Sequence, residues 1–239
     1  MSIQNGFIQI IQDEKKDYQY EEAMKTLRTN IQFSGNGLKV IMLTSAMPDE
    51  GKSETSSQLA ISMAQTEERV LFIDADIRKS VLVARFGGGQ QIYGLTQYLT
   101  GQRLLGEVLY HTNLPNLDII FSGPMAPNPA ELLSEDAFSK LIAWARNEYD
   151  TIIIDTPPLG SVIDGAIIAQ RCDGAILVVE SGALSYRLVQ KAKSQLERTG
   201  CRILGAVLNR VDMAGSGYYH RYYGKYSKYT KYYENEPVK

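Results

Sequence analysis

The pattern of short apolar runs is the feature that most constrains how this chain of 239 residues folds. Each run is too short for a core helix and rich in β-branched residues, and stretches with helical spacing separate most of them. The runs are LKVIML at 38–43, RVLFI at 69–73, NLDIIF at 116–121, TIIID at 151–155, GAILVV at 174–179 and RILGAVL at 202–208. Apolar strands that alternate with helices predict an α/β fold, with a mostly parallel sheet covered by helices on both faces. Functional residues are expected at the carboxyl ends of its strands.

The first run leads directly into AMPDEGKS at 46–53, and a helical pattern follows. This segment matches the phosphate loop G-x-x-x-x-G-K-[ST], with Ala46 in place of the first glycine, and predicts a P-loop NTPase fold. In such a loop, backbone N–H groups and a helix N-terminus converge on phosphates. We expect Lys52 to reach the β- and γ-phosphates of ATP and Ser53 to bind Mg²⁺. The other candidate nucleotide contacts in this segment are Asp49, Glu50, Gly51 and Glu54.

Aspartates follow two further runs. IDADIR at 73–78 places Asp74 and Asp76 just beyond a strand, where two carboxylates repel each other unless a cation lies between them or one binds a proton. TIIIDTPP at 151–158 has the form of a Walker B motif, whose aspartate, here Asp155, holds Mg²⁺ together with the loop serine. A phosphate loop and three carboxylates at strand ends together indicate nucleotide chemistry.

The chain is expected to contain one domain with two appendages. Residues 18–213 form the P-loop domain, which includes an amphipathic helix at 20–33. Residues 1–17 read as a loose arm, and they lack the basic start and cleavage site of a signal peptide. No apolar stretch approaches the length that crosses a bilayer, so a cytoplasmic location is expected. Cys172 and Cys201 are too far apart for a CxxC pair and are expected to be buried free thiols.

The C-terminal tail, residues 214–239, holds eight of the fifteen tyrosines. It carries five basic and two acidic side chains, a net charge of +3, whereas the remainder holds 20 basic and 25 acidic residues, a net charge of −5. Its glycines and few good helix formers predict a flexible segment. The tyrosines are Tyr218, Tyr219, Tyr222, Tyr223, Tyr226, Tyr229, Tyr232 and Tyr233.

These motifs together resemble the bacterial tyrosine kinases of capsular and exopolysaccharide operons, in their free-standing cytoplasmic form, over nearly the whole chain. The resemblance rests on AMPDEGKS, LFIDADIR, IIIDTPP, the loop APNPAELL at 126–133, an N-terminal E-x-x-R-x-x-R-like helix and the C-terminal tyrosine cluster. It implies that Lys52 binds phosphate and that Ser53, Asp76 and Asp155 organise Mg²⁺. Asp74 would accept the proton of the incoming tyrosine, although Asp74 and Asp76 could exchange these roles.

The same resemblance implies that the tail tyrosines are phosphorylated by a neighbouring subunit of a homo-oligomer, which we expect to be a ring. Glu22, Lys25 and Arg28 would form subunit contacts, but lysine stands where the family usually has arginine and cannot form arginine's bidentate pair with a carboxylate. A membrane polysaccharide co-polymerase would activate the kinase and recruit it to the inner face of the membrane. A cognate protein-tyrosine phosphatase is a further expected partner.

Four other interpretations compete with this one, two for the whole chain and two for the tail. A chromosome-partitioning or division-site ATPase shares the predicted architecture, but Met47 stands where those proteins carry a second lysine. NRVD at 209–212 looks like the guanine-reading N-K-x-D of GTPases, but the companion D-x-x-G is absent, so Asn209 is taken as a candidate adenine contact. Nucleic-acid binding by the tail, through stacking tyrosines and lysines, is not expected. A packed structural helix in the tail is the remaining option.

Overall fold

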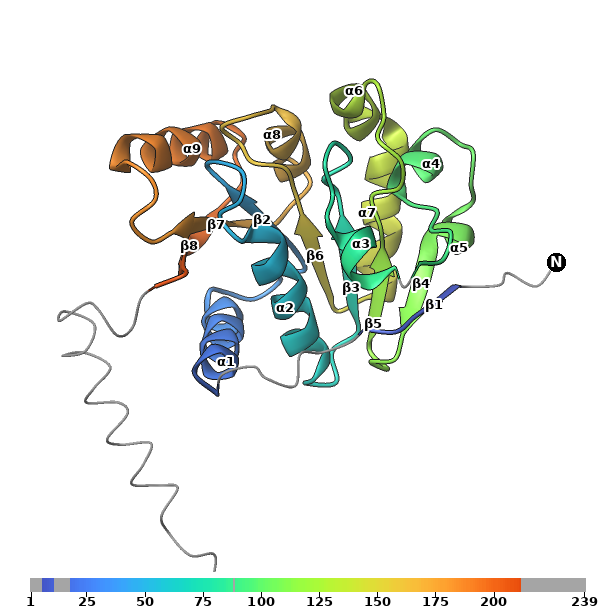
Figure 1. Ribbon diagram of the computed structural model, residues 1–239, viewed down its shortest axis with the longest axis horizontal. Coiled ribbons are helices and arrows are strands. Elements are labelled where there is room, and N and C mark those ends of the chain that lie inside the picture. The colour runs from blue at the N-terminus through green and yellow to red at the C-terminus, as the bar shows by residue number, and fades with distance from the viewer. Residues whose placement is uncertain (1–5, 11–17, 88, 212–239) are drawn as a thin grey trace, which may run out of the picture.

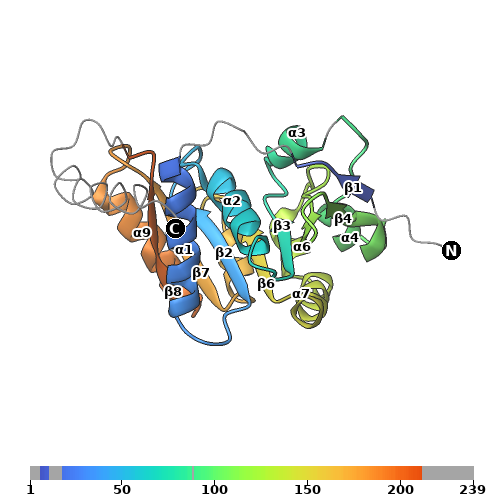
Figure 2. The same cartoon turned by 90° about the horizontal axis from the view of Figure 1, so that it is seen from below.

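The structure is a computed structural model that describes residues 6–10, 18–87 and 89–211. A single eight-stranded sheet forms its centre, with helices on both faces (Figures 1 and 2). The strand order is β1-β4-β5-β3-β6-β2-β7-β8, and all neighbouring strands are parallel except the antiparallel pair β4 and β5. The α/β fold with a mostly parallel sheet is therefore confirmed.

The six predicted strands are present, with ends that differ from the apolar runs by at most two residues. They are β2 (Val40–Ser45), β3 (Val70–Asp74), β5 (Leu117–Ile120), β6 (Thr151–Asp155), β7 (Gly174–Glu180) and β8 (Ile203–Asn209). Strands β2, β3 and β6 are buried along their whole length. Their residues are apolar on both faces because helices cover both sides.

Alternate residues of the strands build two separate cores. Val40 and Met42 face one core, whereas Ile41 and Leu43 face the other. The second core is completed by α1 (Tyr18–Phe33), α2 (Lys52–Ala64) and α3 (Leu82–Phe86). The first is completed by α4 (Leu95–Leu99), α5 (Leu105–Val108), α6 (Pro129–Ser134), α7 (Asp136–Glu148), α8 (Asp164–Ala169) and α9 (Tyr186–Arg198).

Two strands were not predicted, and one of them corrects the expectation for the N-terminal arm. Strand β1 (Gly6–Ile8) pairs in parallel with β4 (Leu109–Thr112). Ile8 and Ile10 are buried, and the backbone N–H of Ile10 donates to Asn113 Oδ1 at 2.7 Å. Residues 6–10 are thus part of the sheet edge rather than a loose arm, because Ile8 and Ile10 alternate with polar or exposed neighbours in a run too short to stand out. Residues 1–5 and 11–17 lie outside the described part.

The helix predicted at 20–33 is confirmed as α1, which begins two residues earlier. Both cysteines are free, as expected; Cys201 is buried and Cys172 is half-buried. Burial raises the pKa of the Cys201 thiol to about 11, and it raises the pKa of Cys172 too. In the described part of the chain, no helix has the length and apolarity that a bilayer crossing requires.

Candidate active site

The carboxyl ends of β2, β3 and β6 bring the predicted motifs to one edge of the sheet. Strand β6 lies between β2 and β3, and Asp74 and Asp155 are partners in the register of β3 and β6. The loop at 46–51 leaves β2 at this same edge and enters α2 at Lys52. Parallel pairing therefore places all three sequence motifs next to one another, although more than 100 residues separate the first from the last.

The phosphate loop depends on the glycine at position 51. Gly51 has a φ of +81°, in the left-handed region, and a Cβ at this position would lie 2.0 Å from Asn209 Nδ2. Asp49 also has a positive φ, which aspartate tolerates better than most residues. The glycine of G-K-S is thus required by the backbone geometry of the turn, whatever the ligand.

Glu50 and Asn209, both predicted to contact nucleotide, hold the loop together in this structure. The buried Glu50 carboxylate accepts the backbone N–H of Met47 at 2.7 Å and that of Glu180 at 3.1 Å. Asn209 Nδ2 donates to the backbone oxygen of Glu50 at 3.0 Å. The loop is therefore fastened to the ends of β7 and β8, and the predicted nucleotide contacts of both residues remain predictions.

Lys52 carries the positive charge at the centre of the site. Its Nζ lies 2.7 Å from Asp155 Oδ1 and 3.0 Å from Ser53 Oγ, and Ser56 Oγ donates to the same Asp155 oxygen at 2.9 Å. Lys52 and Asp155 are both buried. An ammonium group thus lies between Ser53 and Asp155, two of the three side chains that the sequence predicted as ligands of Mg²⁺.

These residues fit a magnesium ion by the chemistry of their donors. Mg²⁺ prefers oxygen ligands and is commonly held by one or two protein side chains together with substrate phosphates. Ser53 Oγ and Asp155 Oδ1 are such ligands, and they already flank a cation, since the Lys52 ammonium stands in for it. Among the described residues, no three carboxylate, histidine or cysteine side chains form a metal-binding group by themselves. A metal at this site would depend on phosphate oxygens for its remaining ligands.

Asp74 is fully buried beside this ion pair. The Ser80 hydroxyl donates to Asp74 Oδ2, and the backbone N–H of Ser122 approaches the same oxygen at 3.4 Å. Burial raises the pKa of Asp74 to about 7, with a further increase from the negative charge of Asp155, whereas the Ser80 hydrogen bond and Lys52 act in the opposite direction. A carboxyl group whose pKa lies near neutrality is suited to proton transfer.

Asp76 holds the loop that follows β3. Its Oδ1 accepts the backbone N–H of Lys79 at 3.0 Å and that of Arg78 at 3.3 Å. Arg78 in turn forms an ion pair with Asp164 at the start of α8. Sequence reasoning missed Ser56, Ser80, Ser122 and Asp164, and it quoted Arg78 within the motif without a role; only Arg78 had a local signal, its place in LFIDADIR.

The remaining predicted site residues lie elsewhere. Glu54, a candidate nucleotide contact, forms an ion pair with Arg85 of α3. Glu22 and Lys25 form an exposed ion pair of 2.7 Å on α1, whereas Arg28 Nη1 donates to the backbone oxygen of Ser62 on α2 at 2.6 Å within the same chain. The eight tail tyrosines lie outside the described residues, and the subunit contacts remain predictions.

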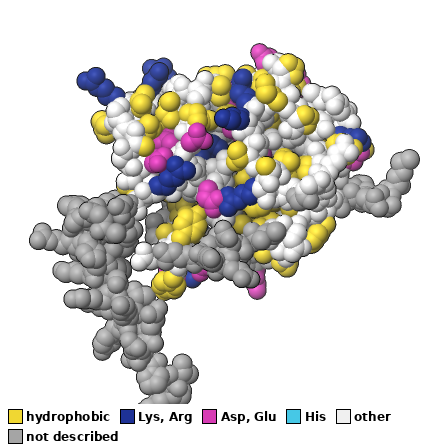
Figure 3. Space-filling view, in the orientation of Figure 1, with side chains coloured by type: hydrophobic (Ala, Val, Ile, Leu, Met, Phe, Trp, Pro, Cys, Tyr) yellow, Lys and Arg dark blue, Asp and Glu magenta, His cyan; other side chains and the backbone are white. Residues whose placement is uncertain are grey.

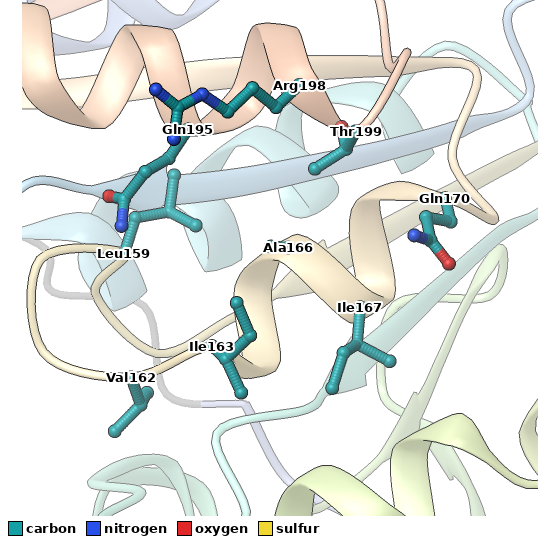
Figure 4. A pocket seen from close by; sticks show the side chains of 9 residues that line it. All are labelled: Leu159, Val162, Ile163, Ala166, Ile167, Gln170, Gln195, Arg198 and Thr199. Atoms are coloured by element: carbon teal, nitrogen blue, oxygen red, sulfur yellow. The ribbon is translucent and has the colours of Figure 1, made fainter.

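A separate pocket of about 320 Å³ lies between α8 and α9 and contains none of the predicted site residues (Figure 4). Its walls are mainly apolar. The side chains that line the pocket are Leu159, Val162, Ile163, Ala166, Ile167, Gln170, Gln195, Arg198 and Thr199.

On the face shown in Figure 3, acidic and basic side chains lie beside one another in small groups.

Comparison with known proteins first defines the class. Residues 38–199 match the family model described as AAA domain, so the nucleotide-binding fold predicted from the phosphate loop is confirmed. The division-site protein MinD of Pyrococcus horikoshii, solved with Mg-ADP, shares this fold at 23% identity, with a TM-score of 0.63 over 74% of this chain and 72% of that one. At that level of identity the likeness concerns the fold alone.

More similar relatives define the family. The tyrosine-protein kinase CpsD of Streptococcus agalactiae is 46% identical over 83% of this chain and 85% of its own length. The kinase domain of the Escherichia coli tyrosine kinase ETK superposes with a TM-score of 0.75 at 32% identity, over 87% of this chain and 92% of that one. The chimeric protein CapA2B2 gives a TM-score of 0.79 at 32% identity, over 86% and 93%. The chain therefore belongs to the bacterial tyrosine-protein kinases, a family of enzymes.

Proposed function

We propose that this kinase uses ATP and Mg²⁺ to phosphorylate the tyrosines of its C-terminal tail, with one copy of the chain acting on the tail of another. The observation that supports this most is the position of the Lys52 ammonium, between Ser53 and Asp155 and beside the buried Asp74. The residues that we assign to phosphate binding, metal binding and proton acceptance lie together at one edge of the sheet. The relatives of the chain include proteins named as tyrosine kinases.

The residues divide the work as follows. Lys52 leaves Asp155 and binds the β- and γ-phosphates, which frees the Asp155 carboxylate and Ser53 Oγ for the metal ion. Bound Mg²⁺ supplies positive charge that screens the phosphate oxygens. Asp76, whose carboxylate lies on the loop after β3, is the remaining proposed metal contact. In this structure, the Lys52–Asp155 pair keeps both buried charges compensated.

Phosphoryl transfer requires that the tyrosine phenol lose its proton. A phenol has a pKa near 10 and is protonated at neutral pH, so a carboxylate must accept the proton as the bond from oxygen to the γ-phosphorus forms. The bond between the γ-phosphorus and the bridging oxygen breaks, and ADP leaves with that oxygen. We assign the proton to Asp74, which must exchange the Ser80 hydroxyl for the phenol.

Labelling with ATP and Mg²⁺ tests the assignment. Phosphate should appear on tail tyrosines of the wild type, and Asp74→Asn should lower the rate while leaving binding of an ATP analogue unchanged. Asp76→Asn should instead raise the Mg²⁺ concentration required. If the two variants show the reverse pattern, the two aspartates exchange roles; if neither changes the labelling, the carboxylates take no part in transfer.

The proposal extends to the cellular setting. The kinase would regulate polymerisation and export of a capsular or extracellular polysaccharide, with a membrane co-polymerase as its activator and anchor and a tyrosine phosphatase to reverse its action. The resemblance to kinases of capsular and exopolysaccharide operons supports this, and the relatives include the tyrosine-protein kinase CpsD. Co-sedimentation of the chain with vesicles that contain the co-polymerase, compared with empty vesicles, tests the anchoring.

A further inference from the structure

One ion pair joins the loop after β3 to the start of α8, and the proposed mechanism does not use it. Arg78 Nε donates to Asp164 Oδ2 at 2.6 Å, and Arg78 Nη2 donates to Asp164 Oδ1 at 2.9 Å. Asp164 is fully buried. A bidentate pair of this kind fixes both the distance and the orientation of the two groups.

The backbone of Arg78 also contacts Asp76. The N–H groups of Arg78 and of its neighbour Lys79 donate to Asp76 Oδ1. A change in the backbone conformation at Arg78 therefore displaces the donors that hold the Asp76 carboxylate. One residue thus connects the carboxylate to α8, through its side chain on one side and its backbone on the other.

The segment that leads to Asp164 is in turn attached to the phosphate loop. The backbone N–H of Gly160 donates to the oxygen of Ala46 at 3.0 Å, and that of Leu159 donates to the oxygen of Ser45 at 2.9 Å. A Cβ at Gly160 would lie 2.1 Å from the Ala46 oxygen, so only glycine permits this approach. The start of α8 therefore keeps a fixed position relative to the phosphate loop.

We propose that Arg78 and Asp164 are positioning residues that hold the Asp76 carboxylate in place relative to the phosphate loop. This inference rests on the proposed role of Asp76 toward the metal ion. Loss of the pair should weaken the response to the divalent cation as well as phosphoryl transfer, because partners behind a metal-binding group commonly alter affinity or activity by about 10- to 100-fold.

The chain offers a matched control. Arg146 and Asp173 form a second bidentate pair, with Nη1 to Oδ2 at 2.9 Å and Nη2 to Oδ1 at 2.7 Å. That pair lies at the opposite edge of the sheet, because Asp173 also accepts the backbone N–H groups of Lys39 and Val40 at the start of β2. Arg146→Lys and Asp173→Asn thus remove an equivalent pair away from the proposed site.

The experiment compares Arg78→Lys and Asp164→Asn with this control pair in the full chain. Hydrogen exchange of the amides at residues 78 and 79, measured without nucleotide, reports the strength of their hydrogen bonds to Asp76. Half-saturation by Mg²⁺ is measured from the thermal stabilisation that a non-hydrolysable ATP analogue produces, and the kcat and KM of tail labelling are measured in parallel. Because Arg78→Lys keeps a positive charge against the buried Asp164, it remains informative should Asp164→Asn fail to fold.

In the Arg78 and Asp164 variants we expect faster hydrogen exchange of the amides at residues 78 and 79 and a lower kcat. The Mg²⁺ concentration at half-saturation should rise about 10- to 100-fold. The variants of the control pair should show none of these changes. Unchanged exchange at these amides, or an equal change in the control pair, would overturn the inference. The exchange could be faster in the variants although the wild type takes no label from ATP. That result would support the positioning role and count against the proposed function.

Discussion

Lys52 Nζ lies 2.7 Å from Asp155 Oδ1, and both side chains are buried. Removal of one partner of a buried pair leaves an uncompensated charge, which costs about 3–5 kcal/mol of unfolding free energy. Lys52→Met should therefore both abolish tail labelling and destabilise the empty enzyme by about this amount, as measured by urea denaturation. Lys193→Met, in the exposed pair with Glu197, should change stability by less than about 0.5 kcal/mol. Equal effects of the two substitutions would contradict the burial argument.

Gly51→Ala should disrupt nucleotide binding. The new methyl group would meet Asn209 Nδ2 at 2.0 Å, in addition to the strain of a positive φ. Gly200→Ala isolates the second effect, since Gly200 has a φ of +79° and a Cβ added there would meet no heavy atom within 4 Å. We expect a cost of about 1–2 kcal/mol for Gly200→Ala with normal binding of an ATP analogue. If Gly51→Ala binds the ATP analogue normally, nucleotide binding does not require Asn209 in its present position.

Arg28 should act as an anchor between α1 and α2. Its hydrogen bond to the Ser62 backbone involves a charged donor, so Arg28→Met should cost about 1.5–3 kcal/mol of unfolding free energy. Lys25→Met, at an exposed position, is the control. Measurement of the assembly mass separates this role from a subunit contact: a changed mass with unchanged stability would favour the contact between subunits.

Asp173 should make the stability depend on acidic pH. Burial alone would raise its pKa, but the Arg146 guanidinium and the backbone N–H groups of Val40 and Lys39 outweigh burial and lower it. Because the folded pKa lies below the unfolded value of about 3.9, the contribution is present above that value and is lost as the pH falls through the folded pKa. The unfolding free energy of Asp173→Asn should therefore decline less steeply below about pH 4 than that of the wild type. If the unfolding free energies of the two proteins fall in parallel with pH, the lowered pKa of Asp173 is contradicted.

Local pattern was sufficient to predict six of the eight strands and the three motifs. Apolar runs such as 151–155 are buried on both faces, so their composition alone identifies them, and parallel pairing then brings Asp74 and Asp155 into register. Strands β1 and β4 were missed because they are only three and four residues long, and His111 is exposed in β4. Their pairing depends on contacts between segments about 100 residues apart.

The partners of the site residues were beyond sequence reasoning for a related reason. The contacts of Ser80 and Ser122 with Asp74, and of Asp164 with Arg78, depend on loops whose conformations no periodicity encodes. Lys52 was expected to contact phosphates, and in this structure it pairs with Asp155 because a buried ammonium needs a counter-charge. Residue types could be assigned to chemistry, but their partners required the three-dimensional arrangement.

Mixing two different variants shows whether one copy of the chain phosphorylates the tail of another. A Lys52→Met chain with its tail intact is mixed with an otherwise active chain whose eight tail tyrosines are replaced by phenylalanine, and ATP and Mg²⁺ are added. If one copy phosphorylates the tail of another, phosphate should appear on the tail tyrosines of the Lys52→Met chain in the mixture. Neither chain should be labelled when it is incubated alone. An unlabelled Lys52→Met chain in the mixture, under conditions in which the wild type labels itself, would contradict phosphorylation between copies.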